Sequence, residues 1–205
     1  MMVAPTRTEP SVPQAALETE LTGQSMGGGL RLLVASAPED AERADRDLRQ
    51  VAGRIDAWAR RLTRFSRTSD LAHLNADADR SPVALRPTIA SVLSHARGMS
   101  RATEGVVDVA MLDARIAAEA EEWSMPTRRA AWQLTGDGRQ PVLIRDGRVR
   151  FDLDGVAKGW IADRALRLLD AYPSALVDAD GDVAIRSSST AGWSIAVAHP
   201  EDDVG

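Results

Sequence analysis

One long amphipathic segment constrains the fold of this chain more than any other feature. Residues 39–62 carry apolar side chains at three- and four-residue spacing, which predicts a single helix with one buried face. Pro38, Glu39 and Asp40 suit the first turn of that helix, because proline and acidic residues are favoured there. The apolar positions are Leu48, Val51, Ile55, Trp58 and Leu62.

The other periodic segments are shorter and alternate irregularly along the chain. We expect helices at 87–102 and 157–171, and a loop leading into a further helix within 106–123. We expect strands near 29–36, 142–152 and 175–186, the second of them a hairpin around Asp146-Gly147, and a last strand within 192–200. The mixture lacks regular βαβ alternation. It therefore predicts an α+β fold with a mainly antiparallel sheet and packed helices.

The length of 205 residues suits one globular domain with a loose end. Residues 1–21 are rich in Pro, Thr, Ala and Glu, which predicts a flexible leader. The domain is then expected to occupy residues 22–205.

Composition excludes several classes of function. The chain has no cysteine, so disulfides, thiolate nucleophiles and thiolate-bound zinc are excluded. A formal net charge of -5 argues against a nucleic-acid backbone binder. No segment has the length and apolarity of a signal peptide or a transmembrane helix, and we expect a cytoplasmic protein.

The stretch FDLDGVAKGW, residues 151–160, holds Lys158, the only lysine in the protein. The pattern predicts a strand that turns at Asp154-Gly155 into a helix. Such a turn exposes backbone N–H groups and can hold a phosphate or another anion, to which Lys158 would add a full charge. The alternative is a plain turn with a surface lysine, and the local pattern alone favours it.

Two further stretches contain candidate acidic ligands. Asp178, Asp180 and Asp182 alternate, so that on one strand they would share a face and could gather a hard cation such as Mg²⁺. The alternative is a turn with solvated acids. Asp108 lies in an otherwise apolar run, so it either needs a buried partner or caps the helix that follows.

Five stretches in order resemble the motifs of the FAD:protein FMN transferases, also called the ApbE-like family. The family carries Met-Gly-Thr, Ser-x-Leu-x-x-Leu-Asn, Gly-Gly-x-Phe-Asp, Asp-Leu-Gly-Gly-Ile-Ala-Lys-Gly-Tyr, and Asn-x-Gly-Gly-Asp before a strand with Trp. The matching stretches are Met26-Gly27-Gly28, SDLAHLN from Ser69 to Asn75, TEGVVD ending at Asp108, DLDGVAKGW, and DADGDVAI followed by Trp193. The resemblance runs from about residue 25 to 200.

The resemblance implies a T-fold-like domain that binds FAD and Mg²⁺. It also implies transfer of FMN from FAD to a threonine of a target flavoprotein, with release of AMP. Met26 and the Ser69 segment would line the flavin pocket, and the carbonyl of Gly155 would be a metal ligand. Asp108, Lys158 and Asp182 would hold the dinucleotide. We expect Asp182 to face the same cleft as Lys158, with Asp180 at a bend.

The sequence departs from the family pattern at several positions. Gly28 stands in place of threonine, Val106-Val107 replace the usual small-aromatic pair, and Asp154 and Asp180 each stand in place of a glycine. A carboxylate beside a diphosphate would repel it unless a metal intervenes. The family's catalytic histidine and its metal-binding Asp and Thr would lie beyond Gly205, so we expect an incomplete domain. A catalytically inert flavin-binding relative is the alternative.

Overall fold

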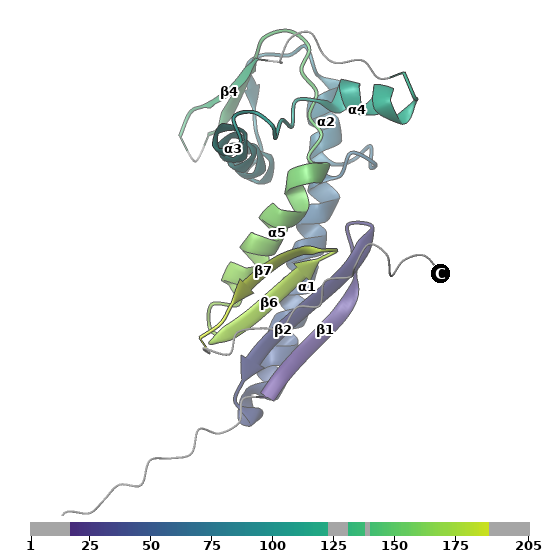
Figure 1. The fold of residues 1–205 in the computed structure, drawn as a ribbon. Helices are drawn as coiled ribbons and strands as arrows, with labels where there is room; N and C mark the ends of the chain where they lie inside the picture. Colours follow the sequence, from purple (N-terminus) through teal and green to yellow (C-terminus); the bar gives the residue numbers. More distant parts are fainter. Residues whose placement is uncertain (1–16, 123–130, 138–139, 189–205) are drawn as a thin grey trace, which may run out of the picture.

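The structure, a computed structural model, describes residues 17–122, 131–137 and 140–188. The larger of two antiparallel sheets lies along a pair of helices, and the smaller sheet lies beyond the end of that sheet (Figure 1). The elements in chain order are β1 (Leu17–Ser25), β2 (Gly28–Ser36), a 3-10 turn (Pro38–Asp40), α1 (Ala41–Leu62), α2 (Asp70–Ala76), β3 (Val83–Ala84), α3 (Pro87–Ala102), α4 (Leu112–Glu119), β4 (Trp132–Thr135), β5 (Val142–Arg145), α5 (Asp154–Leu168), β6 (Ser174–Ala179) and β7 (Asp182–Arg186).

The larger sheet has the strand order β1-β2-β6-β7, and every neighbouring pair is antiparallel. Helices α1 and α5 lie side by side along this sheet, α1 against β1 and β2 and α5 against β6 and β7 (Figure 1). Leu32, Val34 and Val177 on the strands are fully buried, as is Ile55 of α1. These apolar faces lose their contact with water together, which stabilises the layered arrangement.

The smaller sheet has the order β3-β5-β4 and lies near α3 at the other end of the molecule (Figure 1). Leu143 of β5 and Phe151 are fully buried and belong to the same apolar core as the larger sheet. Trp132 of β4 packs edge-on against Phe151, with their ring centroids 5.2 Å apart. One core therefore joins both sheets.

Most of the expected helices are confirmed. The helix at 87–102 has the predicted bounds, the helix at 39–62 is α1 with its preceding 3-10 turn, and the helix within 106–123 is α4. Helix α5 begins at Asp154, three residues earlier than expected. The α+β class with antiparallel sheets is also confirmed. None of the helices among the described residues is both long and apolar enough to cross a membrane.

The expected hairpin at 142–152 is wrong in its second half. Residues 142–145 form β5, but this strand pairs with β3 and β4 and not with the residues after Asp146-Gly147. The backbone of the later residues bonds elsewhere: Val149 N–H donates to the Ala78 carbonyl, and Asp152 N–H to the Val109 carbonyl. Tertiary partners thus satisfy the backbone groups that a hairpin would have paired.

Two other expectations need correction. Residues 17–21, assigned to the flexible leader, belong to β1, because their backbone pairs with β2 from Leu17 opposite Ser36 onward. The strand expected at 175–186, with a break at Asp180-Gly181, is the hairpin β6–β7, in which Asp180 and Gly181 both have positive φ. That pair of conformations makes a two-residue hairpin turn. The strand expected within 192–200, including Trp193, lies outside the described residues.

Candidate functional site

A cleft of about 370 Å³ lies where three segments of the chain meet, and we call it the Lys158 cleft. The segments are the β1–β2 turn, the end of α1 with the residues that follow it, and the start of α5. The cleft is lined by Ser25, Met26, Gly27, Asp56, Ala59, Arg60, Leu62, Thr63, Arg64, Phe65, Asp152, Leu153, Asp154, Ala157, Lys158 and Ile161. Its size and its apolar walls with charged side chains among them are typical of a small-molecule site.

The β1–β2 turn forms one wall of the cleft. Met26 and Gly27 have φ values of 57° and 82°, the left-handed conformations that a two-residue hairpin turn requires. The Ser25 hydroxyl donates a hydrogen bond of 2.7 Å to Asp56 of α1. Met26 is therefore placed in the cleft by a turn that is bonded to the helix.

Ser69 supports a second wall without contributing its hydroxyl to the cleft. Its Oγ donates to the Thr63 carbonyl at 2.6 Å and accepts from the Ala72 N–H at 2.9 Å. Ser69 is thus the N-cap of α2 and fixes the chain just after α1. The structure therefore assigns Ser69 a positioning role at the cleft wall, and its hydroxyl is already committed to protein groups.

Arg64 and Phe65 lie between the two residues of this contact, directly after Thr63 and before Ser69. The Phe65 side chain is 77% exposed, and the Arg64 guanidinium lies 4.2 Å from the centroid of its ring. An exposed aromatic ring is unusual for a core residue and offers a stacking surface. Neither residue could be selected from the sequence, because nothing in the local pattern distinguishes them from the end of the helix.

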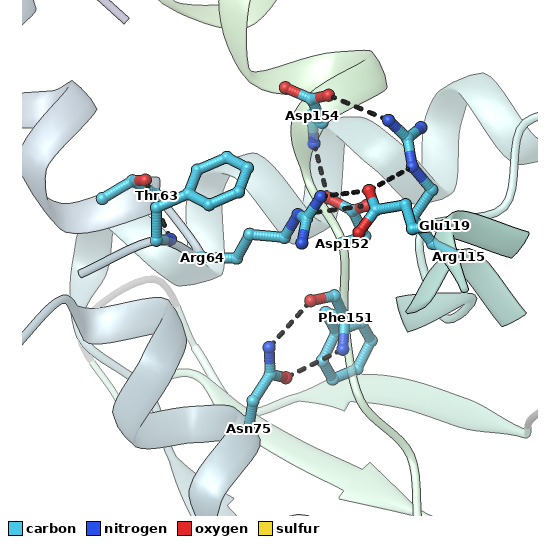
Figure 2. A network of polar contacts seen from close by, with 9 residues as sticks. Thr63, Arg64, Asn75, Arg115, Glu119, Phe151, Asp152 and Asp154 are labelled. Carbon is cyan, nitrogen blue, oxygen red and sulfur yellow. Dashed lines mark hydrogen bonds and ion pairs between the residues drawn. The ribbon is translucent and has the colours of Figure 1, made fainter. Parts of the chain in front are cut away.

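An ionic network closes the side of the cleft that faces α4 (Figure 2). Glu119 accepts from both Arg64 and Arg115, and Arg115 also lies 3.9 Å from the Asp154 carboxylate. The hydrogen bond from Arg115 lowers the pKa of Glu119 and keeps it ionised. Arg64 Nε is buried without a hydrogen-bond partner, 3.9 Å from Asp152.

The segment that leads into α5 is held by Asn75 of α2 (Figure 2). The Asn75 amide donates to the Phe151 carbonyl and accepts from the Phe151 N–H, both at 2.8 Å. The Asn75 side chain therefore satisfies both backbone groups of Phe151, as a neighbouring strand would. Three residues later the chain enters α5, so this pairing determines where the helix begins relative to the cleft.

The start of α5 offers fewer free N–H groups than the sequence predicted. The Asp154 N–H donates to the Asp152 side chain at 3.0 Å, and the N–H groups of Val156 and Ala157 both donate to the Leu153 carbonyl. These three donors already have protein partners. An anion in the cleft would therefore depend mainly on the cationic side chains that line it, which are Lys158, Arg60 and Arg64.

The Lys158 ammonium is held by an acid from the β6–β7 turn. Nζ lies 2.6 Å from Asp180 Oδ2, and the lysine side chain is 25% exposed. This contact raises the pKa of Lys158, to which Asp154 and Asp182 also contribute, and it lowers the pKa of Asp180. Asp180 lies at the bend, as expected. The sequence did not predict that it, and not Asp182, is the partner of the lysine.

Other predicted site residues lie outside the Lys158 cleft. Gly155 and Asp182 line a second cavity of about 270 Å³ between α3, α5 and β7, where Asp182 faces Gly159. Asp182 therefore does not line the same cavity as Lys158, although it lies against the same helix and its charge contributes to the raised pKa of Lys158. Gly155 lies inside α5, where regular helix geometry pairs its carbonyl with the N–H of Gly159.

Asp108 is separate from both of these cavities. It lines a third cavity beside α3, and its carboxylate accepts from the Ala110 N–H at 2.9 Å. The contact is a local turn two residues long, and Asp108 does not cap the following helix, because α4 begins at Leu112 with Met111 at its N-cap. Asp178 is similar, since it accepts from the Gly181 N–H within the β6–β7 turn. Asp178, Asp180 and Asp182 thus have three different environments and do not share one face of a strand.

The comparison with known families identifies the chain. The sequence model described as the ApbE family matches residues 26–205. The chain belongs to the ApbE family. Among curated proteins, none matches the sequence significantly.

Solved structures of ApbE proteins have the same fold as this ApbE-family chain. The flavin transferase ApbE from Vibrio cholerae superposes with a TM-score of 0.66 at 20% identity, over 90% of this chain and 65% of that protein. The ApbE protein of Thermotoga maritima gives a TM-score of 0.65 at 19% identity, over 82% and 59%. The apo flavinyl transferase ApbE of Pseudomonas stutzeri gives 0.66 at 17% identity, over 89% and 63%. The chain thus spans slightly less than two thirds of the length of these proteins.

Proposed function

We propose that this chain is the FAD-binding part of a flavin transferase that moves FMN from FAD to a threonine of a target flavoprotein. The observation that carries the proposal is that Lys158 lines an apolar-walled cleft in a chain of the ApbE family. The flavin transferase activity is named for the Vibrio and Pseudomonas proteins, which support the proposal as relatives in fold. An inert flavin-binding relative is the alternative that the experiments below must exclude.

In this reaction the threonine oxygen bonds to the FMN phosphorus as the phosphoryl–AMP bond breaks. AMP leaves with the electron pair, and the hydroxyl proton goes to solvent or to a base. Such a transfer depends mainly on positioning and on neutralising the charge of the diphosphate. In our proposal Lys158 supplies positive charge, while Met26 and Phe65 offer apolar surface to the flavin ring. Asp108 and Asp182, also expected to hold the dinucleotide, lie in other cavities of the described region.

We keep Mg²⁺ in the proposal as a partner of the FAD diphosphate. Among the residues that the structure describes, no group of three or more His, Cys, Asp or Glu side chains could hold a metal. The Gly155 carbonyl alone does not make a site. Mg²⁺ is commonly bound by one or two carboxylates together with substrate phosphates, so an all-protein cage is not required. The described residues do not by themselves fit the ion, and we derive no catalytic step through it.

The test is a calorimetric titration of the chain with FAD, with and without Mg²⁺. We expect saturable FAD binding that is stronger in Mg²⁺, and weaker binding of FMN, which lacks the diphosphate link to AMP. Equal affinity for FMN and FAD would contradict a dinucleotide site. Absence of FAD binding in both buffers would overturn the proposal. The acceptor threonine is tested separately by AMP release in the presence of a candidate flavoprotein, and the expected cytoplasmic location remains a prediction.

A further inference from the structure

The carboxylate of Asp180 occupies the position next to Lys158 where an anionic ligand would bind. Lys158 Nζ and Asp180 Oδ2 are 2.6 Å apart, the short distance of a charge-assisted hydrogen bond. Lys158 is the only lysine of the chain, so no other ammonium side chain can replace it. Asp180 itself is 42% exposed at the side chain, which leaves it room to move.

The β1–β2 turn provides the space that this carboxylate fills. A Cβ atom placed on Gly28 would lie 2.1 Å from Asp180 Cγ and 2.2 Å and 2.4 Å from its two oxygens. Real Cβ atoms do not approach other atoms so closely, so any side chain at position 28 would displace the carboxylate. Gly28 does not have a positive φ, and its backbone would accept alanine. The absence of a side chain there is therefore what allows Asp180 to reach Lys158.

Asp180 adopts an unfavourable backbone conformation in this position. Its φ is 58°, in the left-handed region that glycine occupies more easily, although aspartate tolerates it better than most residues. A glycine would satisfy the turn without presenting a charge to the cleft. Asp-Gly and Gly-Gly both suit such a turn, so the turn geometry alone does not choose between them, whereas the contact with Lys158 needs the carboxylate.

We propose that Asp180 is a built-in competitor for the anionic group that Lys158 binds, and that Gly28 holds the competitor in place. This inference rests on the proposed function, since it assigns the diphosphate of FAD as the displaced anion. The ligand must displace the Asp180 carboxylate from Lys158 or bind beside it against like-charge repulsion. Either way the presence of aspartate at 180 and glycine at 28 lowers the affinity of the Lys158 cleft for diphosphates.

The first variant is Asp180→Asn, which keeps the size of the side chain and its tolerance of the turn but removes the charge. We expect it to bind FAD about 5- to 30-fold more tightly than the wild type. About fivefold comes from the lost ion pair, and the rest from relieved repulsion. Inorganic pyrophosphate should gain similarly. Titrations at low ionic strength keep the electrostatic difference measurable.

A second variant tests the steric part of the proposal. Gly28→Ala should push the Asp180 carboxylate away from Lys158 and raise the affinity for FAD without changing any charge. The same substitution should have no such effect when it is combined with Asp180→Gly. Gly29→Ala is the matched control, because a Cβ at position 29 would meet no atom within 4 Å. A gain of equal size in Gly29→Ala would overturn the assigned role of Gly28.

The two probes separate this inference from the proposed function. Unchanged or weaker binding of both probes by Asp180→Asn overturns the competitor role, and FAD binding by the wild type would still support the proposed function. If Asp180→Asn binds FAD more weakly than the wild type does, and only in Mg²⁺, then Asp180 is a metal ligand. That result would also overturn the competitor role. If Asp180→Asn tightens both probes but FAD binds no better than pyrophosphate, the competitor stands and the flavin function falls. If no variant binds either probe, both proposals fall.

Discussion

The contribution of Lys158 to FAD binding can be tested by removing its charge, since its side chain is partly exposed. Because Asp180 already neutralises part of this charge, we expect Lys158→Ala to weaken FAD binding by about 10-fold, the lower end for a charge-assisted contact. Lys158→Arg should recover only part of the affinity, since a planar fork does not replace a compact ammonium. Calorimetric titration in Mg²⁺ buffer measures both variants.

The matched control for this experiment is Arg167→Ala. Arg167 is exposed in the last turn of the same helix, and its loss changes the net charge equally. If Arg167→Ala weakens FAD binding as much as Lys158→Ala does, the effect is one of overall charge and not of the cleft.

Tyr172 gives a residue-scale prediction on pH dependence. Its hydroxyl donates to Asp47 at 2.7 Å, and burial together with this contact raises the pKa of Tyr172 to about 12. An unfolded tyrosine loses its proton near pH 10. The raised pKa therefore contributes stability that is fully present below about pH 10. That contribution falls as the pH rises to about 12, by about 2–3 kcal/mol in all.

Tyr172 is the only tyrosine in the chain, so tyrosinate absorbance reports its titration alone. Denaturant unfolding at a series of pH values should show the loss of stability between about pH 10 and 12. The Tyr172→Phe variant should lack this part of the pH dependence. A native absorbance titration centred near pH 10 would contradict the prediction.

At the scale of elements, the connection between α2 and the residues before α5 depends on one side chain. Asn75→Ala removes two hydrogen bonds to the backbone of Phe151, which is fully buried. We expect the free energy of unfolding to fall by about 2–3 kcal/mol, because the buried backbone groups lose their partners. Thermal or denaturant unfolding measures this loss, and FAD affinity should fall with it as the start of α5 loosens.

His73→Ala is the control for this prediction. His73 is exposed on the same helix, so its replacement should change stability by less than about 0.5 kcal/mol. A similar loss in the two variants would mean that α2 is sensitive to any change, and that Asn75 has no special part in holding the connection.

The same connection shows why some elements could be predicted from the sequence and others could not. Helices α1 and α3 have continuous apolar faces, and that periodicity is a local property of the sequence. The residues after Asp146-Gly147 also have the pattern of a strand. Their partners are Asn75, Ala78 and Val109, which are distant in the sequence, so no local pattern could indicate that they leave the sheet.

The candidate site could be predicted only in part, for a related reason. The motif around Lys158 and the turn at Met26 both mark the cleft, and the structure brings them together. Asp182 lines a different cavity from Lys158, because the two-residue turn at Asp180 and Gly181 reverses the chain before it. The contact between Asp180 and Lys158 spans 22 positions and depends on the packing of β6 against α5. Spacing along the chain does not contain that information.

At the scale of the whole molecule, the shared core predicts that the two sheets unfold together. Leu32 in the larger sheet and Leu143 in the smaller one are both fully buried in one apolar cluster. Leu32→Ala and Leu143→Ala should each lower the free energy of unfolding by about 2–5 kcal/mol. Each should shift one common transition.

Far-UV circular dichroism and tryptophan fluorescence should give the same midpoint in the wild type and in both variants. Trp132 lies by the smaller sheet and Trp160 by the larger one, so fluorescence reports on both ends of the molecule. Two separate midpoints, or a variant that lowers only one of them, would show that the sheets are independent folding units.

The contact between positions 28 and 180 makes two departures from the family pattern depend on each other. With threonine at 28, the Cβ would collide with the Asp180 carboxylate in its present position, so an aspartate at 180 would have to turn away from Lys158. With glycine at 28, the carboxylate can lie against Lys158. Two departures that look independent in the sequence therefore share one contact in the structure.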